Sequence, residues 1–429
     1  MIVVSDISTP RLHYILDYVF NMRLGIGYEL KSVTDSVDAS QALFYTEQPR
    51  TECFSVPSSG LLKESDVWQF TPDLTFDNGL PIIFADNSEC TFKFDVFSAI
   101  FWMTSRYEEY LPFLPDEHGR FTPSESFLGR NTLLDNPIVD RWIILFRTEL
   151  QKRFPNLTLK DERFEFLPTI DVDSPWSCLH KGLIRNVGGL LRDTLKFNFK
   201  AVFERLFVLA RLKQDPFFTF GFIDEIHCNL PLKYFVLVSQ RGRFDKSVNP
   251  SNGAFRRFVE QLNGRSQVGL HPSYQASQNE NKFRCELDDF KCIAKSECVE
   301  SRQHFLRIAL PKYYQMIDRL GIKIDYSFGY AENVGFRAGT SRPFRFYDLQ
   351  NDKPLDVVVH PLVAMDVTLH DYLKLSPRQA VERLSTLAET IRQTNGLFTT
   401  LWHNQHFCQT DDWKEWDSIY AELLKIVNK

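Results

Sequence analysis

The sequence predicts an α/β protein in two parts: a distorted (β/α) barrel at residues 161–429, preceded by a smaller α+β domain at residues 1–160. Two observations predict this division. The chain has 429 residues, more than one ordinary core holds, because domains average roughly 100–200 residues. From residue 164 onward, short apolar runs alternate with amphipathic segments, which is typical of a parallel sheet or barrel.

The first part contains a mixture of helical and strand-like segments. Three segments have the apolar spacing of helices: residues 11–22, 95–110 and 136–154. Two segments bounded by Pro, Gly or Ser are typical of strands: residues 53–57 and 80–84. Residues 115–121 are rich in turn formers and predict a loop. Residues 155–163 contain a Pro-Asn pair and a charged run, so we expect them to link the two parts.

The second part is predicted to alternate strands with helices. The predicted strands are residues 166–170, 216–223, 267–270, 301–308, 323–327, 356–360 and 397–402. The predicted helices lie near residues 183–212, 254–262, 311–320, 377–394 and 413–427. In parallel α/β folds, functional side chains collect at the carboxyl ends of the strands. Those ends are therefore where catalytic residues are expected.

Composition and charge exclude several classes of partner. A net charge of −5 argues against nucleic acid, because neutralising phosphates requires a basic surface. No apolar run reaches the ~18 residues of a transmembrane helix. The first residues have neither the basic start nor the apolar stretch of a signal peptide. The eight cysteines are scattered without a CxxC pair, so we expect free thiols and a cytoplasmic location. The oligomeric state stays open.

A basic amphipathic segment interrupts the second part. It covers residues 183–212 and the chain leading into them, and its cations are Lys181, Arg185, Arg192, Lys196, Lys200, Arg205 and Arg211. The simpler interpretation is a solvated helical face. The alternative is contact with a membrane surface or an anionic glycan.

Two carboxylates end the first strand of the second part. Side chains two positions apart on a strand share a face, so Asp171 and Asp173 project together. One carboxylate can bind a divalent metal while the other accepts a proton from water. The alternative is that Asp173 begins a helix or an Asx turn at Asp173-Ser174-Pro175.

Histidines end several later strands. His271 precedes Pro272, which cannot extend a strand ladder, and His403 ends an apolar run. Arg302 and His304 lie two positions apart on a predicted strand, so Arg302 can orient a carboxylate by a bidentate bond while His304 binds a metal. His403 can protonate a leaving amine or stabilise an oxyanion. The alternative is a structural hydrogen bond for each histidine and a buried pair with a carboxylate for Arg302.

Other histidines are weaker candidates. His360 also ends a predicted strand, and His406 lies three residues beyond His403. The remaining histidines have helical or loop contexts without a converging partner, and we treat them as structural: His13, His118, His180, His227 and His370.

From Lys160 onward, the order and spacing of these residues resemble the polysaccharide deacetylase superfamily (the NodB-homology family, carbohydrate esterase family 4). That family opens with T-F-D-D-G, which Thr169–Asp173 resembles with the second Asp displaced by one residue. Its H-[ST]-x-x-H motif is represented by His271 alone, because position 275 is Gln. Its Arg motif, a helix and then a strand with Asp are similar to Arg302, residues 311–320 and Asp325, and its final histidine is similar to His403.

The whole chain is more similar to a bacterial subgroup of deacetylase-like proteins with an uncharacterised N-terminal domain. Signatures of that subgroup are PTIDVD, GLHPSY, SRQHFL, GFRAGT and LWHN, and all five are present. Ile138-Val139-Asp140-Arg141-Trp142 in the first part is also similar to that subgroup.

The resemblance implies a deacetylase-type barrel that removes an N-acetyl group from a sugar or glycan precursor, with a divalent metal for which Zn²⁺ is the first choice. Asp171 would then be the base, oriented by Arg302, and His403 would protonate the departing amine. Asp173 and His271 would be metal ligands. Since Gln275 removes the usual third ligand, His304 is the first choice for that place and His360 the reserve.

Two other functions stay open. One is a non-catalytic glycan-binding or assembly protein that keeps the barrel without a complete metal site. The other is an amidohydrolase that acts on a small non-sugar amide. The first part is expected to present substrate or serve assembly, because its histidines, His13 and His118, have no converging carboxylate partner.

Overall fold

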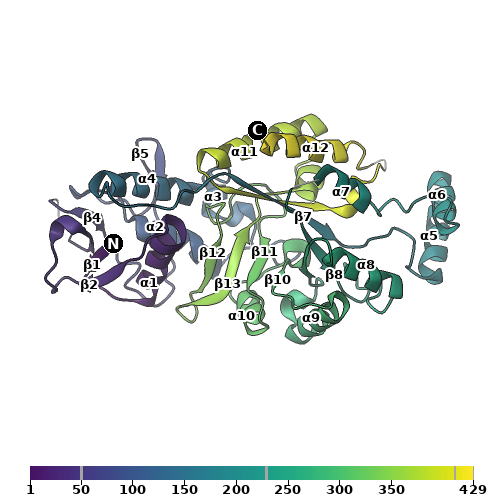
Figure 1. Cartoon of the computed structure of the whole chain (residues 1–429), viewed down its shortest axis with the longest axis horizontal. Helices are drawn as coiled ribbons and strands as arrows, with labels where there is room; N and C mark the ends of the chain where they lie inside the picture. The colour runs from purple at the N-terminus through teal and green to yellow at the C-terminus, as the bar shows by residue number, and fades with distance from the viewer. Residues whose placement is uncertain (49–51, 228–229, 410–411, 429) are drawn as a thin grey trace.

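The computed structural model describes residues 1–48, 52–227, 230–409 and 412–428. Figure 1 shows a smaller N-terminal region beside a larger region built on a long curled sheet. A pair of helices stands away from the larger region at the opposite end of the molecule (Figure 1). The predicted α/β class, with a smaller region ahead of a barrel-like sheet, is confirmed.

The larger region is built on a nine-stranded sheet in the order β12-β13-β11-β10-β9-β8-β7-β15-β14. Its strands are β7 (Glu165–Val172), β8 (Lys233–Leu237), β9 (Gln267–His271), β10 (Glu300–Ser301), β11 (Ile324–Phe328), β12 (Phe344–Asp348), β13 (Lys353–Pro361), β14 (Ala364–Met365) and β15 (Leu397–His403). All neighbours pair in parallel except β12 with β13. Their carboxyl ends therefore share one edge, as expected for a site-bearing α/β sheet.

A short segment links the two ends of this curled sheet. After β13, the Leu362 amide donates to the Phe328 carbonyl of β11 at 2.9 Å, and the Val363 amide donates to the Thr399 carbonyl of β15 at 3.0 Å. The chain thus passes from the β11 side to the β15 side, where β14 pairs with β15. This crossing brings Asp366 to the carboxyl end of β15.

Helices flank the sheet between its strands (Figure 1). They are α7 (Phe220–His227), α8 (Gly253–Asn263), α9 (Glu280–Ala294), α10 (Lys312–Arg319), α11 (Pro377–Gln393) and α12 (Trp416–Val427). The long predicted helix at residues 183–212 is two helices, α5 (Leu183–Leu195) and α6 (Phe199–Leu209), broken where Phe197 has a left-handed backbone.

Two predicted strands are wrong. Residues 216–223 lead into α7, whose buried positions Phe220, Ile223 and His227 are three and four residues apart, the spacing of a helix face. The strand at this point in the chain is β8. The predicted strand 301–308 ends after Ser301, because Phe305 and Leu306 have left-handed backbones, with φ of 63° and 50°.

The smaller region has its own sheet, in the order β2-β1-β3-β4 with parallel neighbours. Its strands are β1 (Ile2–Ser5), β2 (Glu29–Ser32), β3 (Ala42–Thr46), β4 (Phe54–Pro57) and the hairpin β5 (Thr75–Asp77) with β6 (Leu80–Ile82). Its helices are α1 (Pro10–Leu16), which continues as a π-helix, α2 (Val96–Thr104), the short α3 (Phe127–Arg130) and α4 (Ile138–Arg153). The predicted helix 95–110 ends at Thr104 as an α-helix.

Buried ion pairs join the two regions. Arg337, within the GFRAGT signature, donates to Glu109 with an Nε–Oε1 distance of 2.9 Å, and Arg106 donates to the same carboxylate. All three side chains are at most 3% exposed. Arg106 also pairs with buried Glu108 at 2.7 Å, so two carboxylates and two guanidinium groups balance each other away from water. Such a cluster stabilises the contact only while it is complete.

A second cluster joins the IVDRW and GFRAGT signatures. Asp140 accepts hydrogen bonds from Thr340 and from the Ser341 amide, and pairs with Arg23 at 2.9 Å. Arg23 also pairs with Glu162, within the predicted linker. The linker is therefore held by buried charge, and the hydrophobic core runs through both regions without a break.

Two further predictions concern membrane spans and thiols. Among the described residues, no helix combines the length and apolarity that crossing a bilayer requires. Free thiols in the described part include those of Cys53, Cys90, Cys178, Cys285, Cys292 and Cys298. Cys228 lies outside the described residues.

Candidate metal centre and catalytic pocket

The carboxyl edge of the large sheet surrounds a cavity of about 240 Å³. Five of the six predicted site residues line it: Asp171, Asp173, His271, His304 and His403. Three of these end a strand: Asp171 is the second-last residue of β7, and His271 and His403 are the last residues of β9 and β15. The strand order explains the convergence, because β15, β7, β8 and β9 are consecutive neighbours.

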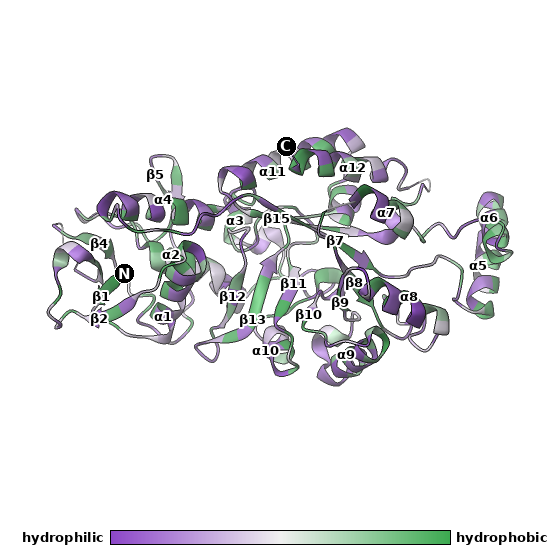
Figure 2. Ribbon diagram, viewed as in Figure 1, coloured by the Kyte–Doolittle hydropathy of each residue, from purple (hydrophilic) through white to green (hydrophobic). Residues whose placement is uncertain are grey.

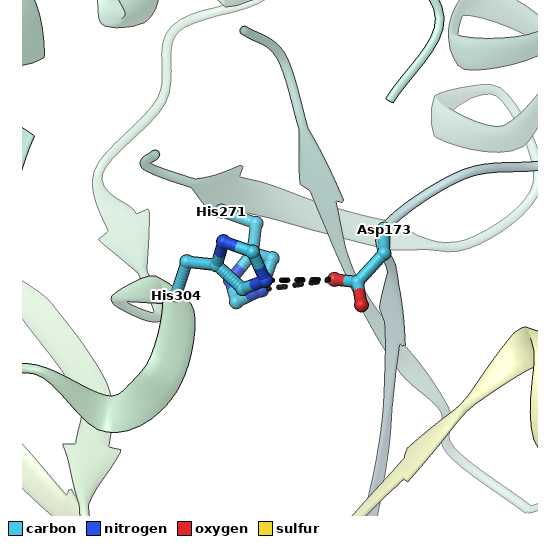
Figure 3. Close-up of side chains that lie close together, drawn as sticks. All are labelled: Asp173, His271 and His304. Carbon is cyan, nitrogen blue, oxygen red and sulfur yellow. Dashed lines mark ion pairs between the residues drawn. The ribbon is translucent and has the colours of Figure 1, made fainter. Parts of the chain in front are cut away.

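Asp173, His271 and His304 form a triad in which the donor atoms face one another (Figure 3). The Asp173 Oδ1 atom lies 3.4 Å from His271 Nε2 and 3.6 Å from His304 Nε2. Two ligand atoms on a tetrahedral zinc, each about 2.0–2.1 Å from it, lie about 3.3–3.4 Å apart. The triad thus has the donor types and nearly the spacing of a catalytic zinc site.

Both imidazoles of the triad are fixed by their other nitrogen. His271 Nδ1 donates to the carbonyl oxygen of Arg302, and His304 Nδ1 donates to Asp245 at 2.8 Å. With the proton on Nδ1, each Nε2 carries a lone pair directed into the triad. Such anchoring of the far nitrogen is common among metal-binding histidines because it sets both tautomer and ring orientation.

The charges of the triad favour a cation between its members. Burial raises the pKa of Asp173, but the nearby His304 and His271 lower it more strongly, to well below its usual range. Burial lowers the pKa of His271, but Asp171 and Asp173 raise it more, to above its usual range. A bound metal cation can replace the proton that these carboxylates attract.

His360, the reserve ligand, lies elsewhere. Its ring packs 4.7 Å from the ring of Tyr326, and it belongs to neither group of converging ligands found among the described residues. Burial, followed by the charges of Lys233 and Arg302, lowers its pKa to about 4. His360 is therefore a neutral histidine of the barrel interior.

Asp171 accepts from Arg302 with its Oδ1 atom, while its Oδ2 atom lies 3.6 Å from His271 Nε2, beside the triad. The Arg302 Nη1 atom donates to Asp171 Oδ1 at 3.1 Å and also to the Thr169 hydroxyl, while Nε donates to the Tyr326 carbonyl. Arg302 was expected to pair with Asp171 through two hydrogen bonds, but it makes one hydrogen bond to this carboxylate. Arg302 is fully buried, and it lies behind Asp171 without lining the cavity.

Asp366, which no sequence pattern indicated, holds His403. The Asp366 Oδ1 atom accepts from His403 Nδ1 at 2.9 Å, and Oδ2 accepts from the His403 amide at 2.7 Å. Burial lowers the pKa of His403, but Asp366 raises it more, to about 10. His403 is therefore a protonated imidazolium at neutral pH, and its Nε2–H remains available for donation. The one sequence signal for Asp366 is that its charge ends the apolar run 361–365.

His406 shares the same carboxylate. Its Nδ1 atom lies 2.7 Å from Asp366 Oδ2, and its ring stacks on Trp413 with a centroid separation of 3.5 Å. Burial lowers the pKa of His406. Asp366, His403 and His406 also have converging donor atoms. However, the carboxylate oxygens are at hydrogen-bond distance from both Nδ1 atoms, so this group is a hydrogen-bonded pair of histidines on one carboxylate.

The N-terminal region also reaches the cavity. Arg120 lines it and donates to the Phe305 carbonyl at 2.9 Å and to the Tyr372 hydroxyl at 3.2 Å. Asp116 fixes the Arg120 guanidinium at 2.7 Å from within the predicted loop 115–121. In the sequence, the four-residue spacing of Asp116 and Arg120 could have indicated that the two side chains pair. It could not have indicated that Arg120 reaches the cavity of the larger region.

Comparisons with known proteins found one family model that matches part of the chain and several solved structures that are distantly similar. Residues 1–155 match a model described as "Family of unknown function (DUF7033)". No curated protein matches the chain. One solved structure with a similar fold is a protein from Mycobacterium smegmatis, provisionally named a polysaccharide deacetylase: identity is 11%, the TM-score is 0.39, and coverage is 62% of this chain and 85% of the other.

Two further solved structures match the same share of this chain, 62%. A 4-alpha-glucanotransferase from Thermococcus litoralis has 11% identity and a TM-score of 0.37, with 38% of its own chain covered. A protein from Parabacteroides distasonis, provisionally named a glycoside hydrolase/deacetylase, has 9% identity and a TM-score of 0.36, with 66% covered. At identities of 9–11%, these similarities do not assign a reaction to this chain. The reaction must be inferred from the side chains of the cavity.

Proposed function

We propose that this chain is a metal-dependent hydrolase that removes an N-acetyl group from a sugar or glycan precursor. One observation carries the proposal: three metal-type ligands, a carboxylate outside that triad and a protonated histidine surround one cavity. Hydrolysis of an amide requires activation of the carbonyl, a base for water and an acid for the departing amine. Each of these tasks has a separate side chain here.

The triad fits a divalent metal, with zinc as the first choice. Asp173 Oδ1 and His271 Nε2 are buried atoms without a hydrogen-bond partner among the described residues, which is costly unless a cation lies between them. A metal bound there would supply Lewis acidity, which polarises a carbonyl group and lowers the pKa of water. Asp173, His271 and His304 would hold it.

The remaining side chains transfer protons. Asp171 takes the proton of the attacking water. Arg302 makes one hydrogen bond to its Oδ1 atom, so its Oδ2 atom is directed at the triad, 3.6 Å from His271 Nε2. His403 donates its Nε2 proton to the departing amine, and the Asp366 carboxylate stabilises its charged form. Base and acid therefore reach the cavity from adjacent strands, β7 and β15.

The walls of the cavity fit an acetylated sugar. A small apolar cluster lines one side, and it comprises Leu306, Ala331, Met365 and Leu401. Such a surface suits an acetyl methyl group, because burying it there removes apolar area from water. Arg120, Tyr372 and Gln405 line the polar side and supply donors for sugar hydroxyls.

The proposal is tested by acetate release. The metal-free full-length chain is incubated with N-acetylated sugars and short chitin-type oligomers, with and without Zn²⁺. We expect acetate only with the metal, and none from Asp173→Ala or His304→Ala, which should also lose zinc affinity in a direct titration. Zinc binding with activity only on small non-sugar amides would instead favour the amidohydrolase, and a wild-type chain that binds no metal would exclude hydrolysis by this route.

The alkaline limb of the pH–rate profile is expected to depend on Asp366. Activity requires protonated His403, so turnover should fall as pH rises through about 10. In Asp366→Asn the main cause of the raised pKa is gone and burial still lowers it, so the limb should move to lower pH. The control is Glu117→Gln, which removes an exposed carboxylate beside His118, outside the cavity. An unshifted limb in Asp366→Asn would remove His403 as the acid.

A further inference from the structure

The helical pair α5–α6 presents an apolar surface that nothing in the described chain covers. Of the nineteen large apolar side chains that are exposed among the described residues, eleven lie between Leu183 and Leu212. Ile184 is 88% exposed, Phe197 80% and Phe203 58%. Figure 1 shows these helices standing away from the sheet, connected to it by two extended segments. Exposed apolar side chains gathered on one element mark an interaction surface.

Both helices are amphipathic, and Figure 2 shows hydrophobic and hydrophilic residues alternating along their ribbons. On α5, Ile184, Val187 and Leu191 are spaced by three and four residues, and on α6, Phe199, Phe203 and Phe207 are each spaced by four, so they form one apolar stripe on each helix. The helices have 13 and 11 residues, whereas spanning a bilayer takes about 20. A helix pair of this kind lies in an interface and does not cross it.

This segment is strongly cationic in an acidic protein. Residues 181–213 contain eight basic and two acidic side chains, a net charge of +6, whereas the whole chain has −5. Its apolar stripe is therefore flanked by positive charge. An amphipathic helix with apolar bulk on one side and Lys or Arg on the other is typical of proteins that bind anionic lipid surfaces.

A basic cavity of about 540 Å³ lies at the root of the helix pair. Six cations line it, and no carboxylate of the described residues does: Lys181, Arg185, Arg192, Arg205, Arg241 and Lys246. Asp193 pairs with Arg192 and Arg205 from outside the lining. The other four form no ion pair with any described residue. Burial and then the neighbouring Arg185 lower the pKa of Lys181 to about 8, as expected where like charges crowd without an anion.

The apolar stripe and the basic cavity are continuous. Ile184, the most exposed apolar side chain, also lines the cavity, and Arg185 beside it donates to the carbonyls of Lys246 and Ser247. The root is fixed by Asp215, whose carboxylate accepts from the amides of Cys178 and Phe217, one on each side of the helix pair. The surface is therefore held in a set orientation.

We propose that α5–α6 is a membrane-docking arm that places its apolar stripe in an anionic phospholipid surface while the basic cavity receives a headgroup phosphate. A second copy that docks through the same helix pair is a poorer occupant, because it would bring +6 against +6. A glycan offers only the small C–H faces of its sugar rings, which pack on single aromatic rings and do not cover a continuous stripe of Leu and Phe side chains. Only an anionic lipid surface matches both the apolar stripe and the charge around it. The inference is independent of the reaction in the pocket.

The test is flotation of the full-length chain with vesicles of phosphatidylcholine, with or without phosphatidylglycerol. We expect binding to the anionic vesicles, loss of that binding as salt rises, and little binding to phosphatidylcholine alone. Phe197→Ser with Phe203→Ser should weaken binding by at least about tenfold. Phe76→Ser, at a 63% exposed position on β5, is the matched control and should bind as the wild type does.

The basic cavity has its own variant. Arg241→Ala with Lys246→Ala should weaken binding by about 30-fold, since each cation near an anionic surface contributes about fivefold. The control is Arg378→Ala, an exposed arginine on α11, which should change nothing. Failure of the wild type to float with anionic vesicles at low salt would overturn the proposal. So would a self-associated chain in sedimentation whose association the Phe197/Phe203 variant abolishes, because a second copy would then cover the stripe.

Discussion

Asp171→Asn is expected to keep its metal and lose about 10²–10⁴-fold in turnover. An amide at this position can still accept the hydrogen bond from Arg302, so the local structure should persist. It cannot accept a proton from water at neutral pH. The Arg302 guanidinium donates to both Asp171 and Thr169, which holds the Asp171 carboxylate beside the triad, where we propose that it acts as the base.

The measurement pairs zinc affinity with turnover for two substitutions. Asp171→Asn should bind zinc within a few-fold of the wild type, whereas Asp173→Ala should not bind it. The contrast matters because both carboxylates lie within 3.6 Å of the same His271 nitrogen. Loss of zinc in Asp171→Asn would make Asp171 a ligand and exchange the roles proposed for the two carboxylates.

Glu109→Ala is expected to destabilise the whole chain by about 3–5 kcal/mol, because it leaves the buried Arg337 without a carboxylate partner and Arg106 with Glu108 alone. Denaturant unfolding of the full-length protein measures this directly. Glu382→Ala, which removes an exposed i,i+4 pair with Arg378, is the control and should cost at most about 0.5 kcal/mol. A loss below about 1 kcal/mol in Glu109→Ala would show that the cluster does not hold the regions together.

The Glu109 carboxylate also predicts that the free energy of unfolding depends on pH at acid pH. Burial raises the pKa of Glu109, but Arg337 and Arg106 lower it more, so the folded value lies below the usual one. A lowered pKa means that its contribution to stability is complete above the unfolded value and is lost as pH falls through the folded one. The difference in unfolding free energy between wild type and Glu109→Ala should therefore shrink as the solution is acidified below about pH 4.

The sequence was sufficient to predict that the residues at the ends of regular strands converge at one cavity. Asp171, His271 and His403 each end an apolar run, and parallel strands bring those ends together whatever the loops do. Asp366 escaped notice because β14 has only two residues, too short to leave a pattern. Its place beside His403 depends on the crossing at residues 361–364, a tertiary feature with no local signature.

His304 reaches the triad through a backbone path that the sequence could not indicate. The predicted strand would have pointed Arg302 and His304 the same way, but β10 stops at Ser301. Arg302 then turns inward to Asp171, while His304 begins a short 3-10 helix whose left-handed Phe305 redirects the chain. Backbone conformations of this kind are set by surrounding contacts, here those of Asp245 and Arg120, and not by local preference.

The loop at residues 241–247 contacts both His304 of the triad and Arg185 of α5. Asp245, which holds His304, lies in the same loop as Lys246 and Ser247, whose carbonyls accept from Arg185 of α5. A phosphate that orders this loop and a metal that orders His304 act on one short stretch of backbone. By thermodynamic reciprocity, any factor by which a lipid surface tightens metal binding is returned as an equal gain in lipid affinity when the metal is bound. This loop is therefore the segment through which the proposed lipid site and the proposed metal site would be coupled.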